Sequence, residues 1–143
     1  MAGILLDKVV FDTSNIISFI LAKNIDYIVD LKFRYNIETY TCSQHLSEIS
    51  KVLAYKKFNK QLVLKPSEYI NFLEKYCNVI EVDERFDRVP DPKDNYLIDL
   101  AHTAKSHYLV SRDPHLLNLK QIRWGKIQIV GITEFKRLVA AKK

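Results

Sequence analysis

The feature that most constrains the fold is an alternation of strand-like and helix-like segments along the chain. Five short runs rich in apolar and β-branched residues have the length of buried strands, and segments with helical periodicity separate them. The strand-like runs are 3–11, 37–41, 78–82, 107–111 and 126–130. Strands that alternate with helices form parallel sheets covered by helices on both faces. The sequence therefore predicts an α/β fold in three layers, α/β/α, with a central parallel sheet of about five strands.

Helices are expected between and after these strands. They cover 14–23, 26–34, 44–55, a short basic helix at 56–63, 67–77, 93–105, a short turn of helix at 114–117 and a terminal helix from 133. The apolar face of the second helix is expected to hold Ile25, Ile28, Val29 and Phe33. Ser43 and Thr133 are the expected N-caps. The polar, Pro-containing segment 83–94 is the best loop candidate, and the sequence predicts one domain over 1–143 because no linker divides it.

Composition narrows the class of protein. Hydrophobic residues make up 48%, with 3 Gly and 4 Pro, as in an ordinary globular protein. Cys42 and Cys77 lie far apart, which favours a reduced, cytoplasmic protein over a disulfide scaffold. The start of the chain lacks the basic region of a signal peptide, and no apolar run reaches the ~20 residues of a membrane span. The net charge of +5 favours a polyanionic partner, although a solvated basic surface is the alternative.

Two aspartates follow strand-like runs directly. Asp12 ends the run in KVVFDTSNII, and Asp113 ends the run in YLVSRDPHLL. If both strands are central and parallel, both carboxylates lie at the carboxyl edge of the sheet, where open α/β sheets bind ligands. Asp also caps helices and forms turns, so capping is the competing interpretation for each residue.

Two further acids are placed to join them. Glu48 stands at the flank of the apolar face of helix 44–55, and Asp94 lies in the first turn of helix 93–105. Asp94 is also well placed to interact with the helix dipole, which is its ordinary explanation. The same geometry places Asp99 opposite the apolar stripe, where it should be solvated.

Carboxylates that lie within a few ångströms of one another repel unless a cation neutralises them. Mg²⁺ and Mn²⁺ prefer carboxylate and water oxygens and leave positions for phosphate. One or two such ions can activate water and stabilise the leaving oxygen of a phosphodiester. A carboxylate site in a basic protein is what metal-dependent phosphodiester hydrolysis requires.

These motifs resemble the PIN-domain ribonucleases, especially the VapC-like toxin components of toxin-antitoxin systems. VVFDTSNIISF resembles the first strand and first acid of the family, HLSEI the helix with the second acid, and DPKDNYLIDLAHTAKSHYLVSRDPHLL the third and fourth acids. IQIVGITEFKRLV resembles the last strand and helix. The resemblance covers nearly the whole chain.

The resemblance implies a PIN-like fold and assigns the metal and catalytic positions to Asp12, Glu48, Asp94 and Asp113. Glu48 would be a ligand or the base that orients the attacking water. The family pattern also matches Thr13 and Ser111, the small hydroxyl residues beside the first and last acids, and Asp99, an acid common in one subgroup. The sequence departs from the pattern where the family has Asn, because Ser14 stands there and Asn15 follows it.

The implied function is cleavage of RNA by a Mg²⁺- or Mn²⁺-dependent endoribonuclease, with a cognate antitoxin protein as partner; a homodimer is left open. The alternative is a non-catalytic RNA-binding or scaffolding protein of the same fold. A receiver domain and a haloacid-dehalogenase-type phosphatase are disfavoured because both need paired acids after the first strand. A zinc site of Cys42, His45 and Cys77 or His107 lacks the spacing of a known finger.

Overall fold

A computed structural model of the chain describes residues 7–82, 92–117 and 127–141. The strands are β1 (Asp7–Phe11), β2 (Ile37–Thr41), β3 (Asn78–Val79), β4 (Tyr108–Val110) and β5 (Gln128–Val130). The helices are α1 (Thr13–Leu21), α2 (Tyr27–Arg34), α3 (Ser43–Leu53), the 3₁₀ turn η1 (Lys56–Phe58), α4 (Pro66–Tyr76), α5 (Pro92–Thr103), α6 (Pro114–Leu117) and α7 (Ile132–Ala140). The predicted alternation is confirmed.

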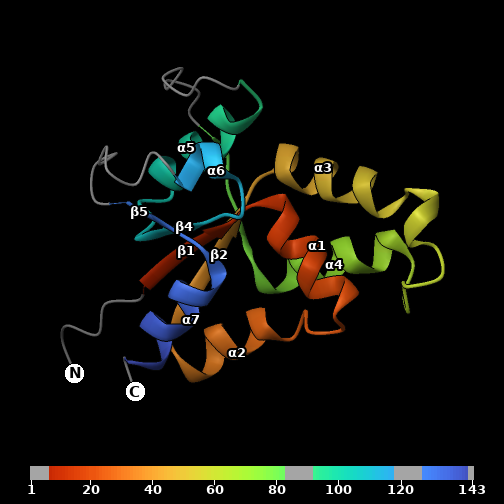
Figure 1. Cartoon of the computed structure of the whole chain (residues 1–143), viewed down its shortest axis with the longest axis horizontal. Helices are drawn as coiled ribbons and strands as arrows, with labels where there is room; N and C mark the ends of the chain where they lie inside the picture. The colour runs from red at the N-terminus through yellow and green to blue at the C-terminus, as the bar shows by residue number, and fades with distance from the viewer. Residues whose placement is uncertain (1–6, 83–91, 118–126, 142–143) are drawn as a thin grey trace.

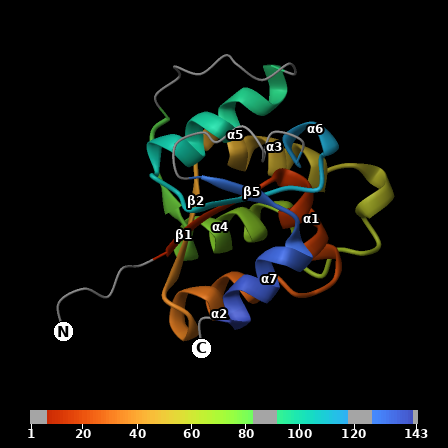
Figure 2. The same ribbon diagram turned by 60° about the vertical axis from the view of Figure 1, so that its left-hand side comes forward.

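The five strands form one parallel sheet in the order β3-β2-β1-β4-β5, with helices on both faces (Figures 1 and 2). The chain moves outward from β1 through β2 to β3, then crosses back through α5 to β4 on the other side of β1. The order therefore reverses between β1 and β4. Ligands of open α/β sheets bind outside the carboxyl ends of the strands at such a point.

Alternating side chains of the central strands serve two separate cores. In β1, Val9 and Phe11 pack with α1, α2, α3, α4 and α7, whereas Val10 packs with α5 and α6. In Figure 2, α5 lies on one side of the strands, and α2, α4 and α7 lie on the other. Because side chains of a strand alternate between its faces, a strand covered on both sides reads as a continuous apolar run. This explains the sequence VVF of β1.

Several local predictions were wrong at the ends of elements. Cys42 and Gly131, not Ser43 and Thr133, occupy the N-cap positions of α3 and α7, and neither cap makes a side-chain hydrogen bond. The third strand is only Asn78–Val79, and of the predicted 56–63 helix only η1 forms. The start of the first strand, most of the loop 83–94 and the start of the last strand lie outside the described residues.

The predicted apolar face of α2 was also wrong in one position. Phe33 is 68% exposed, whereas Ile28 and Leu31 are buried. Ile28 and Leu31 are three residues apart and share one side of the helix, and Phe33 lies on the opposite side at 100° per residue. The core therefore takes Leu31 in place of Phe33.

Candidate functional site

Asp12 lies at the junction of β1 and α1, on the strand pair where the sheet order reverses. Its backbone N–H donates to Val110 O of β4 at 2.8 Å, so the strand pairing continues up to this residue. Asp12 is also the N-cap of α1, and its Oδ1 accepts from the Ser14 backbone N at 3.0 Å. The capping interpretation is correct, but it uses only one carboxylate oxygen.

The other oxygen of Asp12 is bound from β4. Ser111, which is fully buried, donates its hydroxyl to Asp12 Oδ2 at 2.6 Å and accepts from the Asp113 backbone N at 3.0 Å. Ser111 thus connects the acid that follows β1 with the acid that follows β4. Asp113 precedes α6, and its carbonyl accepts from Leu117 N at 3.0 Å. The Asp12 carboxylate is fixed by a backbone N–H and a buried hydroxyl, although Ser14 replaces the usual Asn.

Glu48 is oriented by a tyrosine from a third element. Tyr96 of α5 donates its hydroxyl to Glu48 Oε2 of α3. Burial raises the pKa of Tyr96, and the hydrogen bond to Glu48 raises it further, so the phenol keeps its proton and acts as the donor. Thr13 Oγ1 lies 3.3 Å from the same phenol oxygen. The residue after Asp12 is therefore linked to Glu48 through one side chain.

The three described acids line one cavity of about 720 Å³. Asp12, Glu48 and Asp113 contribute carboxylates to its wall, together with Arg112, which donates from Nη1 to Ser18 Oγ at 2.9 Å. Apolar residues also line the cavity: Ile17, Leu21, Val52, Phe58 and Leu97. The cavity thus joins the carboxyl ends of β1 and β4 to the exposed flank of α3.

The comparison with protein families agrees with this geometry. A family model described as PIN domain matches residues 8–115. The chain belongs to the PIN-domain family. PIN domains are generally nucleases, so the chain has a nuclease fold, and this fold supports a hydrolase activity in general terms. A search of the curated proteins finds no match.

The donor chemistry of the cavity in this PIN domain fits a hard divalent cation. Asp12, Glu48 and Asp113 offer only carboxylate oxygens, which Mg²⁺ and Mn²⁺ prefer. Among the residues that the structure describes, no group of three or more His, Cys, Asp or Glu side chains lies close enough together to hold an ion. The backbone of Asp94 lies in the first turn of α5, but its side chain lies outside the described part. The described carboxylates thus have the right chemistry without forming a complete set of ligands.

Asp99 lies in a different environment from the one the sequence predicts. It is 4% exposed, and its neighbours from Tyr96 to Ala101 are all buried. The described part of α5 packs in one core cluster with Leu109 of β4 and Leu116 of α6. A helix covered on more than one side has no solvated face in this region, so the prediction that Asp99 is solvated was wrong.

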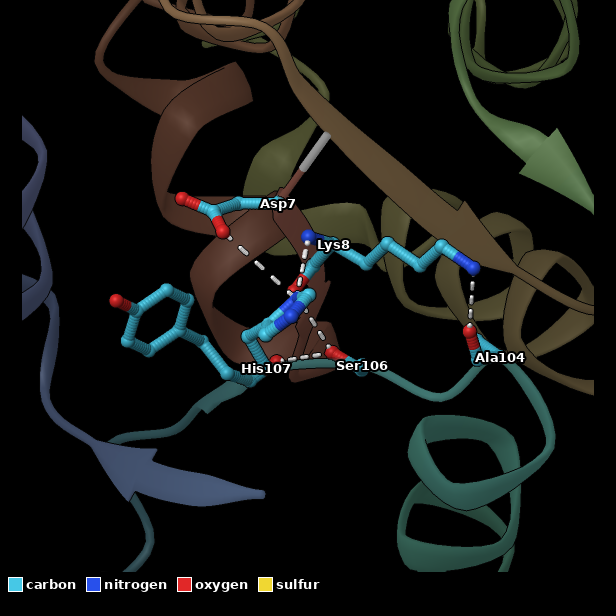
Figure 3. A network of polar contacts seen from close by, with 6 residues as sticks. Asp7, Lys8, Ala104, Ser106 and His107 are labelled. Carbon is cyan, nitrogen blue, oxygen red and sulfur yellow. Dashed lines mark hydrogen bonds and ion pairs between the residues drawn. The ribbon is translucent and has the colours of Figure 1, made fainter. Parts of the chain in front are cut away.

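The four residues considered for zinc do not come together. Cys42 and Cys77 belong to the cores on opposite faces of the sheet. Figure 3 shows His107 at the amino end of β4, where its Nδ1 accepts from the Lys8 backbone N at 3.2 Å. His45 is buried, and its Nδ1 lies 3.0 Å from Thr41 Oγ1. Burial lowers the pKa of His45 to about 4, so it is a neutral core residue near neutral pH.

Two residues of the candidate site were given no role by the sequence. Tyr96 was not singled out, because nothing in its own helix shows that it meets Glu48, a residue 48 positions earlier. Arg112 is not part of the acidic motifs, and it lines the cavity. Its position directly before Asp113 was the available signal.

No described helix of this PIN domain combines the length and apolar character needed to cross a membrane.

Proposed function

We propose that this PIN domain is a Mg²⁺- or Mn²⁺-dependent endoribonuclease that hydrolyses RNA phosphodiester bonds. The observation that supports it is the presence of Asp12, Glu48 and Asp113 in the wall of one cavity at the reversal point of the sheet. Four acids, with Asp94 as the fourth, form the proposed metal and catalytic set. The excess of positive charge suits a polyanionic substrate.

The residues of the cavity have different roles in the proposed reaction. A bound Mg²⁺ or Mn²⁺ would polarise the scissile phosphate and lower the pKa of water. Ser111 and the Ser14 N–H hold both oxygens of Asp12 in one orientation. Glu48 accepts from Tyr96 through Oε2, which leaves Oε1 to accept a proton from the attacking water. Arg112 supplies further N–H donors for a phosphate oxygen.

Cleavage of a labelled RNA tests this proposal. The wild-type protein is expected to produce internal cuts with Mg²⁺ or Mn²⁺ and none in EDTA. Asp12→Asn and Asp113→Asn should each reduce the cleavage rate by at least about 100-fold, since even residues that only orient metal ligands are worth 10- to 100-fold. Unchanged metal-dependent cleavage in a folded Asp12→Asn protein would contradict the assignment. Specific RNA binding without cleavage would favour the non-catalytic alternative.

We further propose that the nuclease is the toxin of a toxin-antitoxin pair, with a cognate antitoxin protein as its partner. The support is the resemblance of the acidic motifs to VapC-like toxins. Induced expression in a bacterial host should arrest growth, and Asp12→Asn should remove the arrest at equal protein level. Co-expression of a small DNA-binding protein encoded next to the gene should restore growth. Growth that is unaffected by the wild-type protein would favour an RNA-processing role instead.

A further inference from the structure

One segment beside the cavity carries positive charge without any acidic residue. Residues 49–67, between Glu48 and Glu68, contain no Asp or Glu and hold five lysines: Lys51, Lys56, Lys57, Lys60 and Lys65. All five lysines are exposed. We call residues 51–65 the basic rim; in Figure 1 it is the yellow segment that runs from the end of α3 toward α4.

Two aromatic rings stack within the basic rim. The rings of Tyr55 and Phe58 lie 6.4 Å apart between centroids with an interplanar angle of 15°. The cause is local, because η1 is a 3₁₀ turn in which side chains at i and i+3 lie above one another. Lys57 Nζ lies 5.0 Å from the centroid of Phe58. Tyr55 is 44% exposed, so part of the stacked pair faces solvent.

The basic rim is continuous with the candidate active site. Phe58 and Val52 line the same cavity as Asp12, Glu48 and Asp113. A strand whose phosphate lies against the acids can therefore extend over Phe58 and reach Tyr55 and the lysines. Lys56 and Lys57 directly precede Phe58 in the chain, so positive charge lies next to this aromatic part of the wall.

The composition of the basic rim favours a nucleic acid over a protein partner. Val63 and Leu64 are exposed, which alone would also suit a protein interface. Protein interfaces, however, are depleted in lysine, and five lysines without an acid would have to be desolvated. Single-stranded nucleic acids are bound by aromatic rings that stack on bases and by lysines that contact phosphates.

We propose that the basic rim binds unpaired nucleotides that flank the scissile bond. One base stacks on Tyr55, supported from behind by Phe58, and Lys56, Lys57 and Lys60 contact the neighbouring phosphates. The choice of RNA as the strand rests on the proposed endoribonuclease function. The nucleotides at this position must be unpaired, since the bases of a duplex are not free to stack on a side chain.

Fluorescence anisotropy with a short fluorescein-labelled oligouridylate tests the stacking. All proteins carry Asp12→Asn and are measured in EDTA, so that the RNA stays intact. Adding Tyr55→Leu should weaken binding about 5- to 100-fold, the worth of one base stacked on an aromatic ring. Tyr55→Trp should retain binding. A duplex RNA of the same length should bind with little dependence on Tyr55.

Phe33→Leu is the matched control. Phe33 is also exposed, and Lys32 Nζ lies 5.9 Å from its centroid, but it is on α2 and does not line the cavity. It should leave the RNA affinity unchanged. An equal loss from Phe33→Leu and Tyr55→Leu, or no loss from Tyr55→Leu, would overturn the proposal.

The lysines are tested by the salt dependence of binding. Replacing Lys56, Lys57 and Lys60 by Gln should reduce the slope of log K against log salt by about 2, since each phosphate contact with a single strand contributes about 0.7. An unchanged slope would overturn the phosphate contacts. Retained RNA affinity with loss of antitoxin binding would show that the rim is a protein interface, which also overturns the proposal.

The two proposals fail in different ways. If the wild-type protein cleaves RNA with Mg²⁺ but Tyr55→Leu binds RNA normally, the rim proposal fails alone. If neither Mg²⁺ nor Mn²⁺ supports RNA cleavage but Tyr55→Leu still weakens RNA binding, the rim proposal stands and the nuclease proposal fails.

Discussion

The two ends of the β1–β4 strand pair carry the same kinds of residue in different surroundings. At the amino end stand Asp7 and Ser106, and at the carboxyl end stand Asp12 and Ser111. Figure 3 shows the contacts at the amino end: Asp7 Oδ1 lies 3.9 Å from His107 Nδ1, and the other two side chains bind backbone carbonyls. Ser106 Oγ lies 3.0 Å from Lys8 O and 2.6 Å from Tyr108 O, and Lys8 Nζ donates to Ala104 O at 3.2 Å.

The carboxyl end differs in what its polar groups hold. Ser111 donates to a carboxylate instead of a carbonyl, and that carboxylate lines the cavity. The direction of parallel strands explains the difference, because loops that bind ligands gather at carboxyl ends. Residue type alone therefore does not identify a site. The same Asp and Ser side chains are structural at one end and are proposed to be catalytic at the other.

Removal of one hydroxyl at each end of the strand pair should have the largest difference in effect on activity. Ser111→Ala should lower RNA cleavage about 10- to 100-fold, because Asp12 loses the group that orients it. Ser106→Ala should leave cleavage unchanged, although each variant should lose about 1 kcal/mol of unfolding free energy from the lost hydrogen bonds. Cleavage rates and urea unfolding of both variants measure this. An equal loss of activity at both ends would mean that Ser111 acts only through stability.

A smaller effect on activity is expected from Tyr96→Phe. The variant keeps the ring but removes the hydroxyl that donates to Glu48 Oε2, so cleavage should fall by about 10-fold. Tyr69→Phe is the matched control. The buried Tyr69 accepts a hydrogen bond from Leu64 N at a distance of 3.3 Å, and it does not contact the acids. Cleavage by Tyr96→Phe at the wild-type rate would show that Glu48 does not need this hydrogen bond.

The smallest effect on activity, and a clear one on stability, is expected from His45. Its pKa is lowered to about 4 by burial, so the unfolded chain binds the proton first as the pH falls. Stability from this group is complete above about pH 6.5 and is lost between about pH 6.5 and 4, by about 3 kcal/mol in total. His45→Gln should flatten the unfolding free energy over this range in urea titrations. Ser106→Ala removes no titrating group, so it should lower the unfolding free energy by the same amount at every pH. If the unfolding free energy of His45→Gln fell with pH as steeply as that of the wild type, His45 would not be the source of the pH dependence.

The sequence was sufficient for the sheet and for the strand-end acids. The buried runs before Asp12 and Asp113, with helices between them, require parallel strands, and parallel strands bring their carboxyl ends to one edge. The position of Glu48 on the flank of α3 followed from its angle around the helix axis relative to the apolar residues of the same helix. These inferences need only local periodicity and one rule of topology.

What the sequence did not predict depends on contacts between distant elements. Asp99 was placed in solvent because a helical wheel assumes one covered face, and α5 is buried on more than one side. The Tyr96–Glu48 contact depends on how α5 lies against α3, which neither helix encodes alone. Cys42 and Gly131 occupy N-cap positions without a side-chain hydrogen bond, so the rule that Ser and Thr cap helices selected the nearby Ser43 and Thr133 instead.

Measurement of metal binding distinguishes a metal-binding carboxyl end of β1 from a structural amino end. Titration of Mn²⁺ into the full chain, followed by electron paramagnetic resonance, measures the bound ion without any need for RNA. The proposal that the carboxyl end holds the ion predicts that Asp12→Asn weakens Mn²⁺ binding at least about 10-fold, whereas Asp7→Asn, on the other end of the same strand, leaves it unchanged. Equal Mn²⁺ binding by the wild-type protein and both variants would contradict it.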